Sequence, residues 1–173
     1  MVCATAGLRW PMTAVVRARL RTDDGNGSAR VGRRYVTQVR VRWSDLDAFR
    51  HVNNAKTVTL LEEARVDWLF SEASRHGVDR LTEGIVVARL EIDYKRPIGM
   101  EVPVTVSMGL TKLGPASMTV DYVVSVAGTT AATASSVLVP VDPVTFRPRR
   151  LDDRERTYLA QFLTPAPVHA GGG

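Results

Sequence analysis

Residues 42–56 read RWSDLDAFRHVNNAK and bring several groups that could do chemistry into a short stretch. Two carboxylates, Asp45 and Asp47, precede the imidazole of His51 and a pair of asparagines. Polar groups placed between two apolar elements are costly to hold unless they are hydrogen-bonded. The stretch is therefore either a turn with a helix cap or a functional site.

In the structural interpretation, every polar group of this stretch satisfies backbone. Asn53 or Asn54 accepts hydrogen bonds from free N–H groups at the start of the following helix. Asp45 and Asp47 satisfy turn backbone in the same way. A lone histidine is then a hydrogen-bonded structural residue. Residue types alone favour this interpretation.

In the catalytic interpretation, the start of the helix supplies unpaired N–H donors and the positive end of its dipole. These groups polarise a carbonyl oxygen and hold the oxyanion that forms. A carboxylate fixed a few residues upstream attacks that carbonyl or takes a proton from water. If Asp45 and Asp47 are both buried, the pKa of one of them is raised. The set suits acyl transfer or hydrolysis, and it contains neither a serine nucleophile elbow nor a two-histidine metal motif.

The elements on either side must hold this stretch in place. Residues 35–43 alternate apolar and polar positions, and that period of two predicts a half-buried strand. From Ala55 onward apolar residues recur at helical spacing, which predicts a helix of about 20 residues. Gly77 can end this helix in a left-handed conformation.

Four strand-like stretches follow, at 84–95, 102–112, 117–126 and 130–141, and a helical stretch follows at 152–163. Short links rich in turn residues join the second stretch to the third and the third to the fourth, which predicts antiparallel hairpins. The order of strand, long helix, four strands and terminal helix predicts an α+β fold with the sheet wrapped on the helix.

Composition predicts one domain with two tails. The chain has 173 residues, 45% of them apolar, which is enough for one core. Residues 1–34 carry seven arginines and two aspartates and so hold the whole net charge of +5, because residues 35–173 carry 16 basic and 16 acidic side chains. We expect a disordered basic extension at 1–34, or partly untranslated sequence, then a domain at 35–163 and a disordered tail at 164–173.

Several partners and compartments are not favoured. The neutral body has no cluster of basic and aromatic residues suited to nucleic acid. No run approaches the roughly 18 apolar residues of a membrane helix, and no secretory signal is evident. The single cysteine, Cys3, supports neither a disulfide framework nor a cysteine metal cluster. We expect a cytoplasmic protein with no nucleic-acid partner, no membrane association, no metal and no cofactor.

The stretch WSDLDAFRHVNNAKTVTLLEEAR resembles the signature of the 4-hydroxybenzoyl-CoA thioesterase-like family of hotdog-fold acyl-CoA thioesterases. That signature is approximately D-x-D-x-x-G-H-V-N-N, then an aromatic residue and L-E-E-A-R, and the similarity continues through EGIVVARLEIDYKRPI to about residue 163. The resemblance is specific for the family and weak on the substrate. It implies a hotdog fold, a curled antiparallel sheet of about five strands around one long central helix. It also implies a homodimer or homotetramer with active sites at the dimer interface.

The resemblance implies roles for individual residues. Asp47 is the family's catalytic carboxylate, acting as nucleophile or as general base for water. Backbone N–H groups near Asn54 polarise the thioester carbonyl, while His51 and Asn53 shape the pocket. We therefore expect catalysis by Asp47, His51 and Asn54, and substrate binding by Asn53, Arg50 and Thr57.

Some positions depart from the family's pattern. Arg50 replaces the glycine before the histidine, so it either distorts a tight turn or faces out toward the phosphates of coenzyme A. Thr57 replaces the aromatic residue, which widens or re-polarises the acyl pocket. Glu62 and Glu63 are reserve catalytic candidates, because part of the superfamily uses an acid on the central helix, and are otherwise ordinary helix charges.

The expected reaction is hydrolysis of an acyl-CoA thioester to a free acid and coenzyme A. A non-catalytic module that binds an acyl ligand is an alternative, motivated by Arg50 and Thr57. A thioesterase acting on an acyl carrier protein, docked by the basic head of the chain, is another. Lys95, Arg96 and Lys112 are candidate phosphate contacts, because the hairpin position where relatives carry a basic or polar residue lacks one here.

Overall fold

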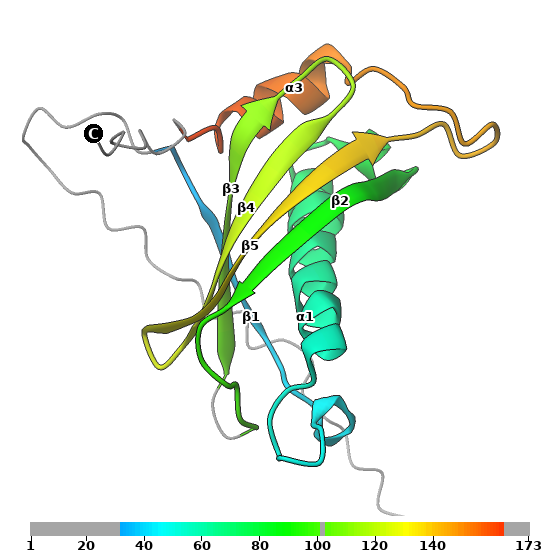
Figure 1. Ribbon diagram of the computed structural model, residues 1–173. Coiled ribbons are helices and arrows are strands. Elements are labelled where there is room, and N and C mark those ends of the chain that lie inside the picture. Colours follow the sequence, from blue (N-terminus) through cyan, green and yellow to red (C-terminus); the bar gives the residue numbers. More distant parts are fainter. Residues whose placement is uncertain (1–31, 101–102, 165–173) are drawn as a thin grey trace, which may run out of the picture.

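The computed structural model describes residues 32–100 and 103–164. In these residues five strands form one antiparallel sheet in the order β1-β3-β4-β5-β2, and a long helix lies against the face toward which the sheet curls (Figure 1). The strands are β1 (Tyr35–Val39), β2 (Ile85–Tyr94), β3 (Val104–Leu113), β4 (Met118–Val126) and β5 (Thr129–Pro140). This architecture confirms the predicted α+β hotdog fold.

Alternation along the strands builds the core. In β3, the side chains of Val104, Val106 and Met108 are fully buried toward the helix, whereas Thr105 and Ser107 are only half-buried. The same period of two runs along β4 and β5, so one face of the sheet supplies most of the core. The predicted hairpins are confirmed, because β3 pairs antiparallel with β4 and β4 with β5.

The first strand is shorter than predicted. It ends at Val39, which pairs with the first residue of β3, Val104. Beyond this pair no further strand residue of β3 is available as a partner. The chain instead turns through the short 3-10 helix η1 (Trp43–Asp45), whose Asp45 N–H donates to the carbonyl of Arg42 at 2.9 Å.

The long helix is confirmed. It runs from α1 (Asn54–Val66) through a π-helical turn, η2 (Asp67–Glu72), into α2 (Ala73–Arg75). Its buried stripe is Thr57, Leu60, Leu61, Ala64, Trp68, Leu69 and Ala73. As predicted, the helix ends at Gly77, which adopts φ 70° and donates its N–H to the carbonyl of Ser74 at 2.9 Å.

The terminal segments close one end of the core. A short 3-10 helix, η3 (Asp79–Thr82), leads into β2, and α3 (Asp153–Ala160) follows β5. Phe162, just after α3, is fully buried and meets the Trp68 ring edge-on, with ring centroids 4.9 Å apart. No helix in the described ranges is long and apolar enough to cross a membrane.

The described chain begins before the predicted domain boundary at residue 35. The guanidinium of Arg34 pairs with the Asp121 carboxylate at 2.7 Å and donates to the Ser107 hydroxyl at 2.8 Å, across β3 and β4. Arg33 lies over the ring of Phe162, 5.1 Å from its centroid. Cys3 and most of the predicted basic extension lie outside the described residues, as does nearly all of the predicted C-terminal tail.

Candidate active site

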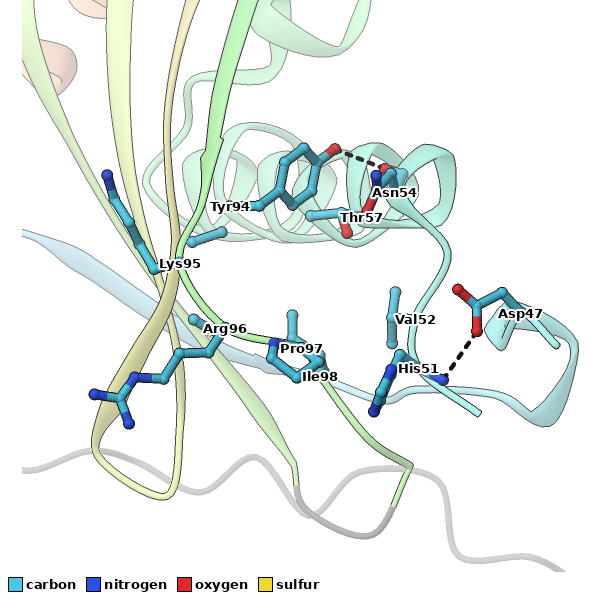
Figure 2. A pocket seen from close by; sticks show the side chains of 12 residues that line it. Asp47, His51, Val52, Asn54, Thr57, Tyr94, Lys95, Arg96, Pro97 and Ile98 are labelled. Carbon is cyan, nitrogen blue, oxygen red and sulfur yellow. Dashed lines mark hydrogen bonds between the residues drawn. The ribbon is translucent and has the colours of Figure 1, made fainter. Parts of the chain in front are cut away.

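A cavity of about 330 Å³ opens where the loop before α1 faces the end of β2 (Figure 2). It is lined by Asp47, His51, Val52, Asn54, Thr57, Tyr94, Lys95, Arg96, Pro97, Ile98, Ala131 and Ala132. Two segments far apart in the sequence are joined here, because the Val52 N–H donates to the carbonyl of Ile98 at 2.8 Å. The cavity thus brings together four of the six predicted site residues: Asp47, His51, Asn54 and Thr57.

Asp47 is half-buried near the start of the loop between η1 and α1, and only one of its carboxylate oxygens accepts hydrogen bonds from that loop. Its Oδ1 accepts the backbone N–H groups of Phe49 at 2.8 Å and His51 at 3.2 Å. Its own N–H donates to the carbonyl of His51 at 2.8 Å. No described residue donates a hydrogen bond to Oδ2. Figure 2 shows the second oxygen turned toward the side of the loop on which Asn54 lies.

Asp45 has a different environment although it is two residues away. Its side chain is buried, with only 3% exposed, and its Oδ2 accepts the Arg42 N–H at 2.7 Å. Its carbonyl accepts the N–H of Asn53, the residue that caps the helix, at 2.8 Å. Asp45 therefore ties the strand end to the helix start and does not line the cavity.

The start of α1 supplies hydrogen-bond donors to the cavity. Asn53 is the helix cap, and its side chain accepts the Ala55 N–H at 2.9 Å. Asn54, the first helical residue, lines the cavity, and none of the described residues accepts its backbone N–H. Its carbonyl is held by the hydroxyl of Tyr94, which donates to it at 2.9 Å (Figure 2). Asn53 was expected to bind substrate; in the structure it caps the helix and is not among the residues that line the cavity.

Buried apolar side chains form part of the cavity wall. Val52, Ile98 and Ala132 are buried, with 6%, 5% and 1% of their surfaces exposed. Thr57 is also buried, with 2% exposed, and its hydroxyl is the polar group among these side chains. Whether Thr57 widens or re-polarises the acyl pocket stays a prediction.

Arg50 forms a tight turn at the position where the resemblance predicts glycine. It adopts φ 62°, the left-handed region that glycine enters without steric cost, and donates its N–H to the carbonyl of Asp47 at 3.0 Å. The turn is therefore closed despite the substitution. The Arg50 side chain is exposed and does not line the cavity in one chain.

Two of the three predicted phosphate contacts lie at the cavity, and the third lies in a distant hairpin. Lys95 and Arg96 are exposed cavity residues at the end of β2, and the N–H groups of both donate to the carbonyl of Ala131. Lys112 pairs with Thr119 near the opposite end of the sheet. Within one chain, only Lys95 and Arg96 of the three predicted phosphate contacts reach this cavity.

The reserve acids lie elsewhere. Glu62 and Glu63 line a separate shallow depression on the outer face of the helix, together with Thr59 and Val66. Glu63 pairs with the guanidinium of Arg42 at 2.7 Å. Within a single chain, neither glutamate is brought to the cavity that contains Asp47.

Sequence reasoning missed several cavity residues, including Tyr94, Val52 and Ile98. The period of two in the strand at 84–95 could have placed Tyr94 on the helix-facing side, directly before the end of the strand. Ile98 follows a proline in a loop, where no period predicts what a side chain will contact. Among the described residues, no three His, Cys, Asp or Glu side chains gather where they could hold a metal ion.

A carboxylate oxygen without a protein donor, an N–H donor at a helix start and an apolar recess can together act on an acyl group. The carboxylate can serve as base or nucleophile. The helix start can stabilise an oxyanion. The recess can take the carbon chain of the acyl group, and the basic rim suits a phosphorylated leaving group.

The chain is similar to known thioesterases. The family model described as the Thioesterase-like superfamily matches residues 41–164. Long-chain acyl-CoA thioesterase FadM of Escherichia coli (strain K12) is 31% identical over 129 residues, which make up 73% of this chain and 98% of FadM.

Solved structures with similar folds carry related descriptions. A thioesterase of Thermus thermophilus, solved in complex with coenzyme A and zinc, superposes with a TM-score of 0.62 at 33% identity and covers 73% of this chain and 92% of its own. The probable thioesterase YbaW of Escherichia coli superposes with a TM-score of 0.62 at 30% identity, covering 75% of this chain and 98% of its own.

Proposed function

Because the chain belongs to the Thioesterase-like superfamily, we propose that it hydrolyses acyl-CoA thioesters, with Asp47 as the catalytic carboxylate. One observation carries the proposal. The cavity is lined both by Asp47, whose Oδ2 has no donor among the described residues, and by Asn54 at the start of α1. A thioester carbonyl bound between them would meet a carboxylate and an N–H donor at once.

Two routes are open to this carboxylate. As a general base, Asp47 takes a proton from water while the water oxygen adds to the carbonyl carbon. The C–S bond then breaks, and the sulfur receives a proton, which leaves an acid and the thiol of coenzyme A. As a nucleophile, Asp47 adds to the carbonyl and expels the thiolate to form an anhydride, which water then hydrolyses to regenerate the carboxylate.

The other site residues have supporting roles in this proposal. The Asn54 N–H and the positive end of the helix dipole stabilise the oxyanion that forms on the carbonyl oxygen. His51 contributes an imidazole to the wall that faces the thioester. Thr57, Val52 and Ile98 surround the start of the acyl chain, and Asn53 keeps the helix start in place. Because FadM is named for long-chain acyl-CoA, a long-chain substrate is the first to test.

We further propose that the chain forms a homodimer through β2. This strand is an edge of the sheet, so one row of its backbone groups has no strand partner among the described residues. Val86 and Val87 on it are each 44% exposed. Arg89 and Glu91 form an ion pair on its outer face, so a second copy paired antiparallel about Leu90 would set each arginine opposite a glutamate.

Thiol release from short, long and aromatic acyl-CoA thioesters tests the reaction, with the wild-type protein and Asp47→Asn measured together. Turnover that is lost in the variant supports the assignment of Asp47. An Asp47→Asn protein as active as the wild type on the best substrate contradicts it. Single-turnover hydrolysis in oxygen-18 water tests for the nucleophile route. Label in the Asp47 carboxylate would require an anhydride that water opens at the aspartyl carbon, whereas the general-base route places the label in the product acid alone.

The same panel addresses the alternatives. Saturable acyl-CoA binding without any thiol release would favour a non-catalytic binding module. Turnover confined to acyl carrier protein substrates, and weakened in a chain that lacks residues 1–34, would favour a carrier-specific thioesterase. Rapid release from free acyl-CoA excludes the first alternative and makes the second unnecessary.

A further inference from the structure

The loop between β5 and α3 carries two strongly exposed apolar side chains. Val144 is 83% exposed and Phe146 is 76% exposed. Figure 1 shows this loop, in orange, projecting past the start of β2 and away from the core. Exposed apolar side chains gathered on one projection indicate a contact with something outside the chain.

The loop is organised by its own hydrogen bonds. Val141 and Pro148 form an antiparallel bridge at its base. At its tip the Asp142 carboxylate accepts the Thr145 N–H at 2.7 Å, the Thr145 hydroxyl at 2.9 Å and the Val144 N–H at 3.1 Å. These bonds, the Thr145 N–H first among them, hold the pKa of Asp142 below its usual value. These bonds fix the backbone of the tip.

The conformation of Phe146 supports a role for its side chain. Its φ is 54°, a left-handed conformation that is unusual for an aromatic residue and free of strain for glycine. The ring is exposed, so core packing does not explain its presence at a strained position. Strain at an exposed residue is an observation from which a functional contact can be inferred.

The position of the loop matters once a second copy is added, and this step rests on the proposed dimer. Pairing about Leu90 sets Val86 beside Tyr94 of the partner subunit. The base of the loop lies at the start of β2, because the Val141 N–H donates to the carbonyl of Gly84 at 3.0 Å. In this pairing the base of the loop lies roughly two strand spacings, about 10 Å, from the end of the partner's β2, where the partner's cavity opens.

The side chains at this junction suit a nucleotide. Arg147 is exposed and forms no ion pair with the described residues, and Lys95 and Arg96 are exposed at the cavity. Guanidinium groups bind phosphates through paired hydrogen bonds, and exposed aromatic rings stack on bases. An aromatic side chain next to an arginine offers both contacts to one nucleotide.

We propose that Phe146 and Arg147 of one subunit bind the nucleotide end of coenzyme A in the partner's active site. Phe146 stacks on the adenine, and Arg147 pairs with a phosphate group that Lys95 and Arg96 of the partner subunit also attract. The inference rests on the proposed function, because it assumes both the dimer and an acyl-CoA substrate. It assigns the loop to the leaving group and not to the acyl chain.

The test compares acyl-CoA with the matching acyl-pantetheine, which keeps the thioester but lacks the nucleotide. Phe146→Gly removes the ring and also relieves the strained backbone, so the variant should fold at least as well as the wild type. We expect KM for acyl-CoA to rise roughly tenfold, within the range for one lost base-stacking contact, with kcat and the acyl-pantetheine KM unchanged. Arg147→Gln should likewise raise KM for acyl-CoA and leave KM for acyl-pantetheine unchanged. Arg154→Gln, which removes an exposed charge from α3, should leave KM for both substrates unchanged.

Other outcomes overturn the proposal. An equal rise in KM for both substrates would place the loop on the acyl or pantetheine portion. Unchanged KM for both substrates in both loop variants would leave the loop without a part in binding. Calorimetric titration with coenzyme A and with pantetheine separates this inference from the reaction. If Phe146→Gly binds coenzyme A roughly tenfold more weakly but binds pantetheine as the wild type does, the result supports the inference even when no thioester is hydrolysed. Unchanged binding of coenzyme A contradicts the inference.

A mixed dimer decides whether the loop acts on its own site or on its partner's. One subunit carries Asp47→Asn and the other carries Phe146→Gly, each with its own affinity tag. If the loop acts on the partner's site, the active Asp47 is served by an intact Phe146, and KM for acyl-CoA is that of the wild type. If the loop acts within its own chain, the active site lacks the ring and KM is raised, which contradicts the proposal. A protein that stays monomeric contradicts it as well.

Discussion

Asp45 and Asp47 show how two identical residue types at a short spacing acquire different roles. Asp45 is buried and its carboxylate accepts a backbone N–H of its own turn. Asp47 is half-buried and lines the cavity, and only one of its carboxylate oxygens accepts hydrogen bonds from its loop. The structural interpretation therefore fits Asp45, and the geometry favours the catalytic interpretation for Asp47.

Substitution of the two aspartates should separate stability from activity. In Asp47→Asn the remaining oxygen can still accept the Phe49 and His51 N–H groups, so the thermal midpoint should hardly change. Its kcat should fall by about a hundredfold to ten-thousandfold, the range for loss of a general base. Asp45→Ala leaves the Arg42 N–H without its acceptor and should cost about 0.5–1.5 kcal/mol of unfolding free energy, the usual net value of one hydrogen bond. Thiol-release kinetics and denaturant unfolding of both variants check the pair, and a marked loss of stability in Asp47→Asn would argue against this division.

Arg50→Gly should stabilise the protein. Arg50 adopts φ 62°, and relief of a non-glycine residue in the left-handed region is worth about 1 kcal/mol. The gain is reduced by the greater freedom of glycine in the unfolded chain. Denaturant unfolding measures the difference, and Arg50→Ala is the matched control, because it removes the charge but keeps the strain. Equal stability of the Gly and Ala variants would show that the turn stores no strain.

At the scale of elements, α3 is attached through a buried ion pair. Glu155 is fully buried and accepts both terminal nitrogens of Arg149, at 2.7 and 2.8 Å, and the Asp152 N–H at 2.7 Å. Glu155 in turn raises the pKa of the Arg149 guanidinium. Arg149 also donates to the carbonyl of Arg80, so the pair joins α3 to the segment before β2.

Removal of one partner of this pair should cost more than removal of both. Arg149→Met leaves the buried Glu155 carboxylate without its partner, and we expect the free energy of unfolding to fall by about 3 kcal/mol or more. Arg149→Met combined with Glu155→Leu removes both charges and should recover a large part of that loss. Denaturant unfolding of the single and double variants measures the coupling. A double variant as unstable as the sum of its parts would mean that the two side chains act independently.

The N-terminal cap of α3 should make a pH-dependent contribution to the free energy of unfolding. The Asp152 carboxylate accepts the Glu155 N–H at 2.9 Å, and this bond, ahead of smaller effects of Arg154 and Arg80, holds its pKa below the usual value. A lowered folded-state pKa means stability that is present above the unfolded-state pKa and lost as pH falls through the folded-state pKa. Asp152→Ala should therefore cost about 1 kcal/mol at neutral pH and less in strong acid. Unfolding free energies of the wild type and of Asp152→Ala, measured from neutral pH downward, check this. A difference between the two proteins that does not change with pH would contradict the prediction.

At the scale of the whole molecule, the exposed edge of β2 is the feature that a second copy would complete. Its charges are self-complementary, because Arg89 and Glu91 are two residues apart on the outer face and flank Leu90. An antiparallel pair about Leu90 matches each charge with its opposite. The same arrangement brings the loop that carries Phe146 toward the second cavity, so assembly and substrate binding are linked in this proposal.

Charge exchange tests that assembly. Glu91→Arg sets arginines opposite one another in the dimer, and Arg89→Glu does the same with glutamates, so each variant alone should dimerise more weakly, by about 1 kcal/mol or somewhat more. A mixture of the two variants restores opposite charges and should recover wild-type affinity as a heterodimer. Sedimentation equilibrium of each variant and of the mixture measures this. Weakened variants that the mixture does not rescue would exclude this register.

Local pattern was sufficient to predict the type and order of the main elements, although not every end, because β1 stops at Val39 and not at residue 43. A period of two, a period near 3.6, turn residues and one glycine predicted the strands, the long helix, the hairpins and the helix end, because each depends on neighbours in the chain. The motif around Asp47 predicted the family for the same reason, since its residues lie within one loop and one helix start.

Tertiary structure decided what periodicity does not report, namely which distant segments meet. It joined Tyr94 and Ile98 to the Asp47 loop, buried Asp45 and put Lys112 near the far end of the sheet. It also left β2 as an edge and directed the Phe146 loop beyond that edge. A repeating pattern assigns a side chain to a face, but distances across the molecule follow from strand order, register and packing, which are set by contacts between residues far apart in sequence.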